Sequence, residues 1–327
     1  MLGSLPAITA TRAVLGLAAG GIGTTATTLI VDYYDEAQSQ ILGGQAAVMA
    51  LASMIYTILG GLLTDLSWRA PFGAYGFGLV LAGPAFYVLP EPDTGTPSDD
   101  ASESMPDTAA VPWGRVGLLY GLAFLGLTVF NLIRVELPYY LRAMGLTSGF
   151  WIGVILSAGT VTGATASFAY DRMRARLGAW GTLALAFGVF AAGFGVIAAS
   201  ASAGAVLGGL LLAGGGMGLL VPSLTDGVGE AVPESVRGRA LGGLSTLRNL
   251  GRFASPVLTA PVLVGTGTAA SFVGAAALAG GLTLLLLGWM AVCRLPPRHN
   301  PIPASARGRG AERGGHRAET QSSLCNA

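Results

Sequence analysis

The sequence predicts an all-α, multi-pass transmembrane helical bundle of about nine spans. Of its 327 residues, 52% are hydrophobic and only 11% are charged, and the mean hydropathy is +0.63. A soluble domain carries about 25% charged residues, which it needs to cover its surface. The apolar runs are also long and continuous, whereas the strands of a membrane β-barrel are short and alternate apolar with polar residues.

Each expected helix is an apolar stretch whose length is close to that needed to cross the hydrocarbon, which is about 20 residues. The stretches in residues 1–90 form a partial N-terminal half and lie at about 7–31, 41–64 and 70–90. Those in residues 114–293 form a six-helix C-terminal half and lie at about 114–141, 149–170, 178–200, 203–225, 240–264 and 268–293. Glycine pairs such as Gly159/Gly163 and Gly214/Gly218 have the small-x-x-x-small spacing that permits close helix packing.

Two polar segments complete the predicted domain organisation. Residues 91–113 contain six acids and several prolines, which is typical of a disordered linker. Residues 294–327 are rich in Pro and then in Arg and Gly, so we expect a disordered tail.

The 18 arginines predict the orientation of the spans, because positive residues gather on the cytoplasmic side of a membrane protein. Twelve lie in the loops and tail of one face, two (Arg69 and Arg142) lie on the other face, and four lie inside spans. We therefore expect a multi-pass protein of the cell membrane with its linker and C-terminus in the cytoplasm. The net charge of +1 gives a nucleic-acid partner no electrostatic support.

A short internal repeat relates the two halves. Asp32 and Glu36 precede a Leu-Gly-Gly at residues 42–44, and Asp226 and Glu230 precede a Leu-Gly-Gly at residues 241–243. Two halves built on one plan, with a solute site between them, are typical of secondary transporters.

Four segments resemble motifs of the major facilitator superfamily. Residues 12–16 resemble the Arg-x-x-x-Gly motif of its fourth helix, and residues 171–178 resemble its Asp-Arg-x-x-x-Arg-x-Gly loop between helices eight and nine. Residues 233–242 resemble the loop before helix eleven, and residues 137–141 resemble the outer end of helix seven. The motifs occur in the family's order and on the expected faces, over nearly all of residues 7–293.

This resemblance implies secondary active transport of a small solute by alternating access. It also implies that the nine spans correspond to helices four to twelve of the family, so we expect the first three helices to be missing from this chain. The expected partners are a small solute, a coupling proton or cation, and the lipid bilayer.

Charged and polar side chains inside the spans are the candidates for the solute pathway, because a charge at mid-membrane costs about 2.5–3.5 kcal/mol on insertion scales. These are Arg12, Asn131, Arg134, Glu136 and Tyr140. Arg12 and Arg134 would bind an anionic or zwitterionic solute, and Glu136 would tune coupling to protons. The alternatives are purely structural roles: a backbone hydrogen bond for Arg12, snorkelling or a structural pair for Arg134, and an interfacial position for Glu136.

The resemblance further implies a gate of ion pairs at the cytoplasmic face. Its expected members are Asp171, Arg172, Arg176, Asp226, Glu230, Arg248 and Arg252. Such pairs would bias the rocking equilibrium of a transporter and break when the inner side opens. Simple anchoring by positive residues is the alternative, above all for Arg174 and Arg176.

Two other functions are alternatives to transport. A membrane-embedded enzyme would need intramembrane His, Ser/Asp pairs or metal ligands, and no span contains His. We therefore expect no catalytic residues, no metal and no cofactor. The other alternative is a transport-inactive remnant, since a site between two halves needs both halves.

Overall fold

The computed structural model describes residues 38–67, 69–88 and 111–294, together with isolated positions between 10 and 25. All regular structure in these residues is helical, and six of the helices are long and apolar enough to cross a membrane. Arg12 and the predicted tail lie outside the described residues, as does most of the first predicted span and of the linker. The chain divides into two compact units.

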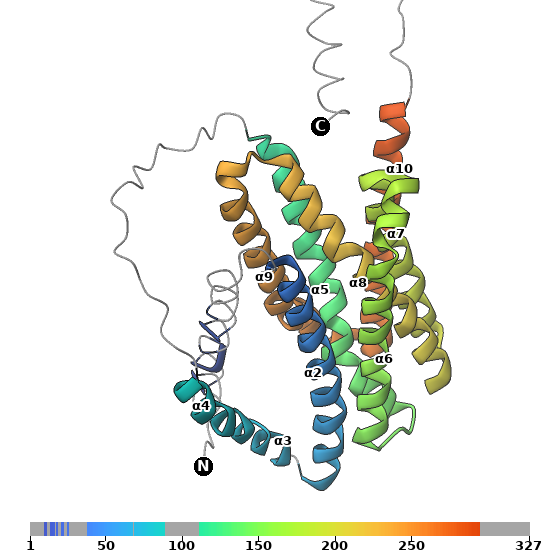
Figure 1. Ribbon diagram of the computed structural model, residues 1–327. Coiled ribbons are helices and arrows are strands. Elements are labelled where there is room, and N and C mark those ends of the chain that lie inside the picture. Colours follow the sequence, from blue (N-terminus) through green and yellow to red (C-terminus); the bar gives the residue numbers. More distant parts are fainter. Residues whose placement is uncertain are drawn as a thin grey trace, which may run out of the picture. The chain divides into compact units, whose positions relative to one another are not determined.

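The first unit contains the first part of α2 (Gln38–Leu66), followed by α3 (Ala70–Gly73) and α4 (Gly76–Val88) (Figure 1). The stretch predicted as one span at 70–90 is broken by a turn at Ala74 and Tyr75. Glycines on both sides of this turn disfavour a continuous helix. Hydropathy alone therefore predicted one crossing helix where the chain forms two shorter ones.

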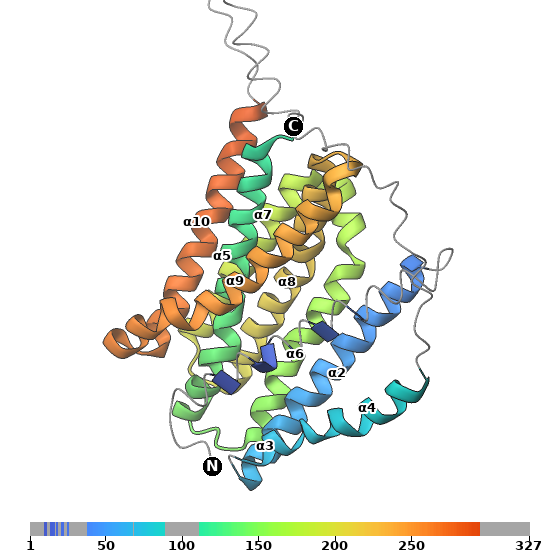
Figure 2. The ribbon, with the colours of Figure 1, turned by 90° about the vertical axis from the view of Figure 1, so that its left-hand side faces the viewer.

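The second unit contains residues 57–65 of α2 and six long helices that run side by side (Figures 1 and 2). These helices are α5 (Trp113–Ala143), α6 (Gly149–Phe168), α7 (Tyr170–Ala199), α8 (Ala203–Ala231), α9 (Glu234–Thr266) and α10 (Thr268–Arg294). Helix α8 packs against α6 and α7, α10 packs against α7, and α9 packs against α5. Each of the six spans predicted for the C-terminal half falls on one of these helices. The six helices that are long and apolar enough to cross a membrane are α2, α5, α6, α7, α8 and α10, so the predicted span at 240–264, which falls on α9, is not among them.

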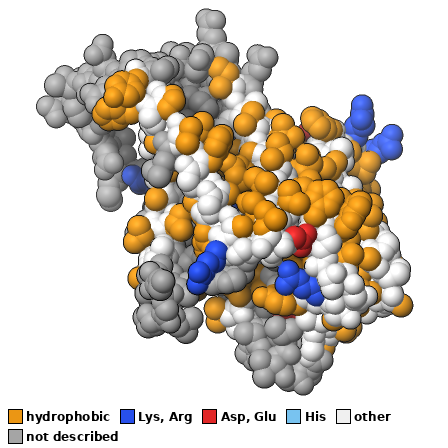
Figure 3. Space-filling model, turned by 90° about the horizontal axis from the view of Figure 1, so that it is seen from below, with side chains coloured by type: hydrophobic (Ala, Val, Ile, Leu, Met, Phe, Trp, Pro, Cys, Tyr) orange, Lys and Arg blue, Asp and Glu red, His pale blue; other side chains and the backbone are white. Residues whose placement is uncertain are grey.

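An aromatic column forms the centre of the second unit. Phe187, Phe190 and Phe194 follow one another along one face of α7, as their spacing of three and four residues requires, and all are fully buried. Phe194 stacks on Phe272 of α10 with ring centroids 6.3 Å apart. The outer flank is also apolar, because Leu284 and Leu285 on α10 are 70% and 71% exposed. Hydrophobic side chains also cover much of the face seen from below in Figure 3. Lipid, which is as apolar as these side chains, is the solvent that such a surface fits.

Helices α6 and α8 touch backbone to backbone through the glycine pairs that the sequence spacing predicts. A Cβ atom on Gly214 would overlap the carbonyl oxygen of Gly159, and one on Gly218 would overlap the carbonyl oxygen of Gly163. Small residues on both helices are therefore a condition of this contact.

Two connections that were predicted to be loops on the cytoplasmic face are largely helical. The predicted loop at 171–177 forms the start of α7, which bends at Gly178 where φ is 73°. Glycine adopts this left-handed conformation without the clash that a Cβ atom would cause. Similarly, α8 continues to Ala231 and α9 starts at Glu234.

The start of α6 is held by a carboxylate from α2. The backbone NH groups of Gly149 and Phe150 donate to Asp65, over 2.6 and 3.1 Å, and the Ser148 hydroxyl donates to it over 3.3 Å. One turn before Asp65, Gly61 lies against Gly149 so closely that a Cβ atom on either would overlap the other's carbonyl oxygen. The carboxylate thus satisfies NH groups that the first turn of a helix leaves unpaired.

Candidate functional site

A pocket of about 210 Å³ lies in the second unit beside Arg134. Its lining residues come from α2, α5, α6 and α8 and are Thr57, Phe130, Ile133, Arg134, Leu156, Gly159, Thr160 and Leu210. Arg134 is the one charged member of this lining, the two threonines supply hydroxyl groups, and the other side chains are apolar. The volume is below the about 300–1,000 Å³ of sites for drug-sized ligands, so the pocket suits a small solute.

Arg134 is exposed within the second unit, although it lies in a membrane-spanning helix. No Asp or Glu among the residues that the structure describes comes within 4.0 Å of its guanidinium. A lipid-facing charge at this depth is costly, whereas a charge in a water-filled cavity is not. The positive charge of Arg134 is of the sign that attracts anions.

Asn131 lies one turn before Arg134 on α5 and connects this helix to α9. Its side-chain NH₂ donates to the backbone carbonyl of Arg252 over 3.0 Å. Arg252 in turn donates from its guanidinium to the Asn249 side chain, also over 3.0 Å. Arg248 lies one turn before Arg252, and both arginines lie near the middle of the 33-residue α9.

Glu136 and Tyr140 point into the helical core and are not among the residues that line the Arg134 pocket. Glu136 is 1% exposed, and neither of its carboxylate oxygens has a hydrogen-bond partner within the described part of the chain. The Tyr140 hydroxyl donates to the backbone carbonyl of Ser200 over 3.1 Å, and its ring packs edge-on against Phe272. Tyr140 therefore has a packing role in this conformation.

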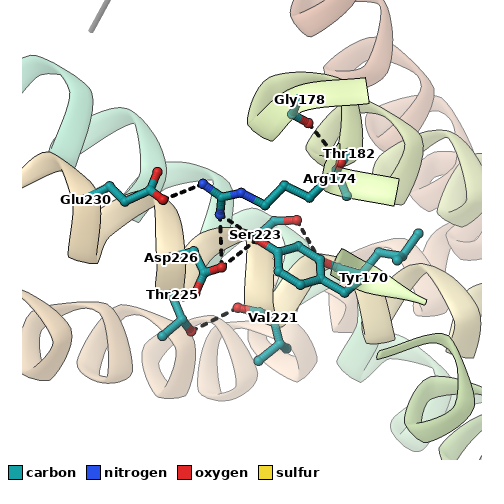
Figure 4. A network of polar contacts seen from close by, with 10 residues as sticks. Tyr170, Arg174, Gly178, Thr182, Val221, Ser223, Thr225, Asp226 and Glu230 are labelled. Carbon is teal, nitrogen blue, oxygen red and sulfur yellow. Dashed lines mark hydrogen bonds and ion pairs between the residues drawn. The ribbon is translucent and has the colours of Figure 1, made fainter. Parts of the chain in front are cut away.

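A second polar group joins α7 to α8 near the cytoplasmic ends predicted for these helices (Figure 4). The guanidinium of Arg174 contacts Asp226 at 2.9 Å and Glu230 at 2.5 Å. The Tyr170 hydroxyl accepts a hydrogen bond from Arg174 and donates one to Asp226, each over 2.9 Å. The Arg174 side chain is 24% exposed, and the two acids are 45% and 53% exposed.

Of the residues expected in a cytoplasmic gate, only Asp226 and Glu230 belong to this group. Asp171, Arg172 and Arg176 are exposed, and none of them forms an ion pair with another residue of the described ranges. Arg248 and Arg252 lie in the middle of α9, well away from the start of that helix at Glu234. The cation of the group is Arg174, which is not among the expected gate residues and lies one helical turn after Tyr170 on the same face of α7.

No group of three or more His, Cys, Asp or Glu residues that could hold a metal ion occurs in the described part of the chain. A family model described as Major Facilitator Superfamily matches residues 1–256. No curated protein matches the chain.

Proposed function

Because this chain belongs to the Major Facilitator Superfamily, we propose that it carries a small anionic solute across the cell membrane by alternating access. Membership makes it a multi-pass membrane protein and a transporter of the major facilitator type. The proposal assigns no catalysed reaction to it. The observation that supports an anionic solute is Arg134, a cation on a membrane-spanning helix that lines a small pocket.

Glu136 supports coupling of this transport to protons. A buried carboxylate without hydrogen bonds or a cationic partner is costly, while a protonated carboxyl group is much less so. Glu136 lies two residues from Arg134 on the same helix but on its buried side. In this proposal, the proton binds to Glu136 and the anion binds to Arg134. Both residues belong to α5, so either event can shift the position of this helix.

The polar group around Arg174 is evidence for a contact that stabilises the six-helix half internally. All of its members lie on α7 and α8, two helices that pack directly against each other. A gate that opens between two halves needs partners on both of them. We therefore propose that the Arg174 group keeps α7 and α8 together while the C-terminal half moves as one body.

Uptake by the full chain in liposomes tests the proposed function. The chain is given a panel of labelled small solutes that includes monovalent anions, dianions, a zwitterion and glucose. We expect uptake of an anion above that of empty liposomes, and a loss of roughly tenfold or more in Arg134→Gln because the anion would then lose the one charged side chain that lines the pocket. Arg142→Gln is the matched control, since Arg142 is exposed in the last turn of the same helix.

Two results would contradict the proposal. Uptake of glucose alone, at the same rate in Arg134→Gln as in the unaltered chain, would contradict the proposal that the solute is an anion. Folded protein that takes up no solute of the panel would instead favour the transport-inactive remnant.

A further inference from the structure

Three arginines approach one another where α5 meets α9. Arg248 and Arg252 are four residues apart on α9, so they lie on the same face of that helix. The hydrogen bond from Asn131 to the backbone of Arg252 places α5 at the same level, and Arg134 follows one turn after Asn131. Because α5 packs against α9, Arg134 and Arg252 extend from neighbouring turns of the two helices.

These three positive charges have no carboxylate partner among the residues of known placement. The ion pairs in those residues all involve Arg174 or Arg237. Arg252 uses its guanidinium to reach the neutral Asn249 side chain. The nearest acid along α5, Glu136, is buried with both oxygens free of hydrogen bonds. The cluster therefore holds three like charges on two helices that pack against each other.

Neighbouring like charges repel one another, and no carboxylate of the described residues offsets this repulsion. An anion with a single charge would leave two of the three arginines uncompensated. A compact anion with two or more charges would balance most of the cluster. Each guanidinium also offers paired NH donors that match the oxygens of carboxylate or phosphate groups.

We propose that the solute carries at least two negative charges, as a dicarboxylate or a phosphate group does, and that Arg134, Arg248 and Arg252 hold it together. This inference rests on the proposed function and specifies its substrate class. The neighbouring pocket then receives the uncharged remainder of the solute. Its threonine hydroxyls and apolar walls, Phe130 and Leu156 among them, suit a short body with few polar groups.

Binding of three simple anions to the purified full chain tests the inference. Succinate and inorganic phosphate are the multivalent probes, acetate is the monovalent probe, and sodium chloride keeps the ionic strength equal at a mildly alkaline pH. We expect succinate or phosphate to bind at least about tenfold more tightly than acetate, which corresponds to about 1.4 kcal/mol. Titration calorimetry or the rise in melting temperature measures the difference.

Variants of α9 show whether the cluster causes this preference. We expect Arg252→Gln and Arg248→Gln each to weaken binding of the multivalent anion about tenfold or more while changing acetate binding much less. Arg252→Lys keeps the charge and should retain most of the preference, which separates loss of charge from loss of folding. Arg142→Gln should bind like the unaltered chain.

The outcomes are distinguishable from failure of the proposed function. Acetate binding as tight as that of succinate and phosphate would overturn the inference and leave an anion transporter. The same holds if the preference survives in both Arg252→Gln and Arg248→Gln. Failure of the unaltered chain to bind succinate or phosphate would also overturn the inference, whereas the proposed function would fall only if the uptake panel shows no anion.

Discussion

Arg174 is the cation of a polar group whose two acids are about half exposed. In Arg174→Gln both ion pairs and the hydrogen bond to Tyr170 are lost. Water screens the exposed acids, so we expect a loss of about 1–2 kcal/mol in the free energy of unfolding, below the value for a fully buried pair. Chemical or thermal unfolding in detergent measures it.

Arg176→Gln is the matched control for this change, because Arg176 lies in the same turn region of α7 and is exposed. It should alter stability by less than about 0.5 kcal/mol. Equal losses in both variants would mean that the positive charge of the segment matters and the specific contacts of Arg174 do not.

Glu136→Gln replaces a buried acid with a neutral side chain of the same shape. We expect the variant to fold at least as stably as the unaltered chain, because no charge is left to bury. If protons couple through Glu136, the pH dependence of uptake should become flat in the variant. Uptake at several external pH values measures this, and an unchanged pH profile would leave Glu136 with a packing role.

The positions of Arg134 and Arg174 show what the sequence reveals about single residues. Arg134 could be predicted, because a charge within an apolar span is conspicuous on grounds of cost alone. Arg174 could not, since it is one of three arginines in a polar segment expected to be a loop. Only the helical phase of that segment, which places Arg174 on the face of Tyr170, distinguishes it from Arg172 and Arg176. The walls of the pocket, such as Leu156 and Thr160, carry no signal of their own.

At the level of helices, replacement by Ala should have opposite effects on stability at Gly214 and at Gly215. In Gly214→Ala the new Cβ atom would meet the backbone of Gly159 and the hydroxyl of Thr162, so α6 and α8 must separate. We expect a loss of about 1–3 kcal/mol, as for other overpacked sites. Gly215 has nothing within 4 Å of such an atom, so Gly215→Ala should stabilise the chain by up to about 1 kcal/mol through helix propensity.

Unfolding of the two variants in the same detergent measures the difference in sign. A stabilising effect of both would show that α6 and α8 do not touch at Gly159 and Gly214. A destabilising effect of both would show instead that Gly215 also faces a neighbouring helix.

The helices themselves were predicted well where hydropathy is the cause of their formation. The span expected at 149–170 corresponds to α6 at Gly149–Phe168. Their ends were predicted less well, because hydropathy reports where a helix crosses lipid and is silent about polar turns beyond it. Residues 171–177 and 226–231 are polar turns of this kind. They are helical, although hydropathy predicts loops there.

For the whole molecule, the distribution of arginines predicts that the linker and the C-terminus are cytoplasmic. Single cysteines introduced at Ser98 and Ser202, with Cys293 and Cys325 replaced by Ser, test this. A membrane-impermeant maleimide should label Ser202→Cys in intact cells and should label Ser98→Cys only after the cells are opened. Labelling of Ser98→Cys from outside would reverse the orientation.

The contact between Asp65 and the start of α6 is electrostatic, whereas the contact between Gly61 and Gly149, one turn earlier on α2, is steric. A helix N-terminus carries about half a positive charge, and the Asp65 carboxylate faces it through the NH groups of Gly149 and Phe150. Salt at about 0.1 M screens such charges over about 10 Å, whereas it has no effect on a steric fit between glycines. Rising ionic strength should therefore loosen the first turn of α6 before the glycine contact yields. Amide hydrogen exchange at Gly149 and Phe150 would report this fraying.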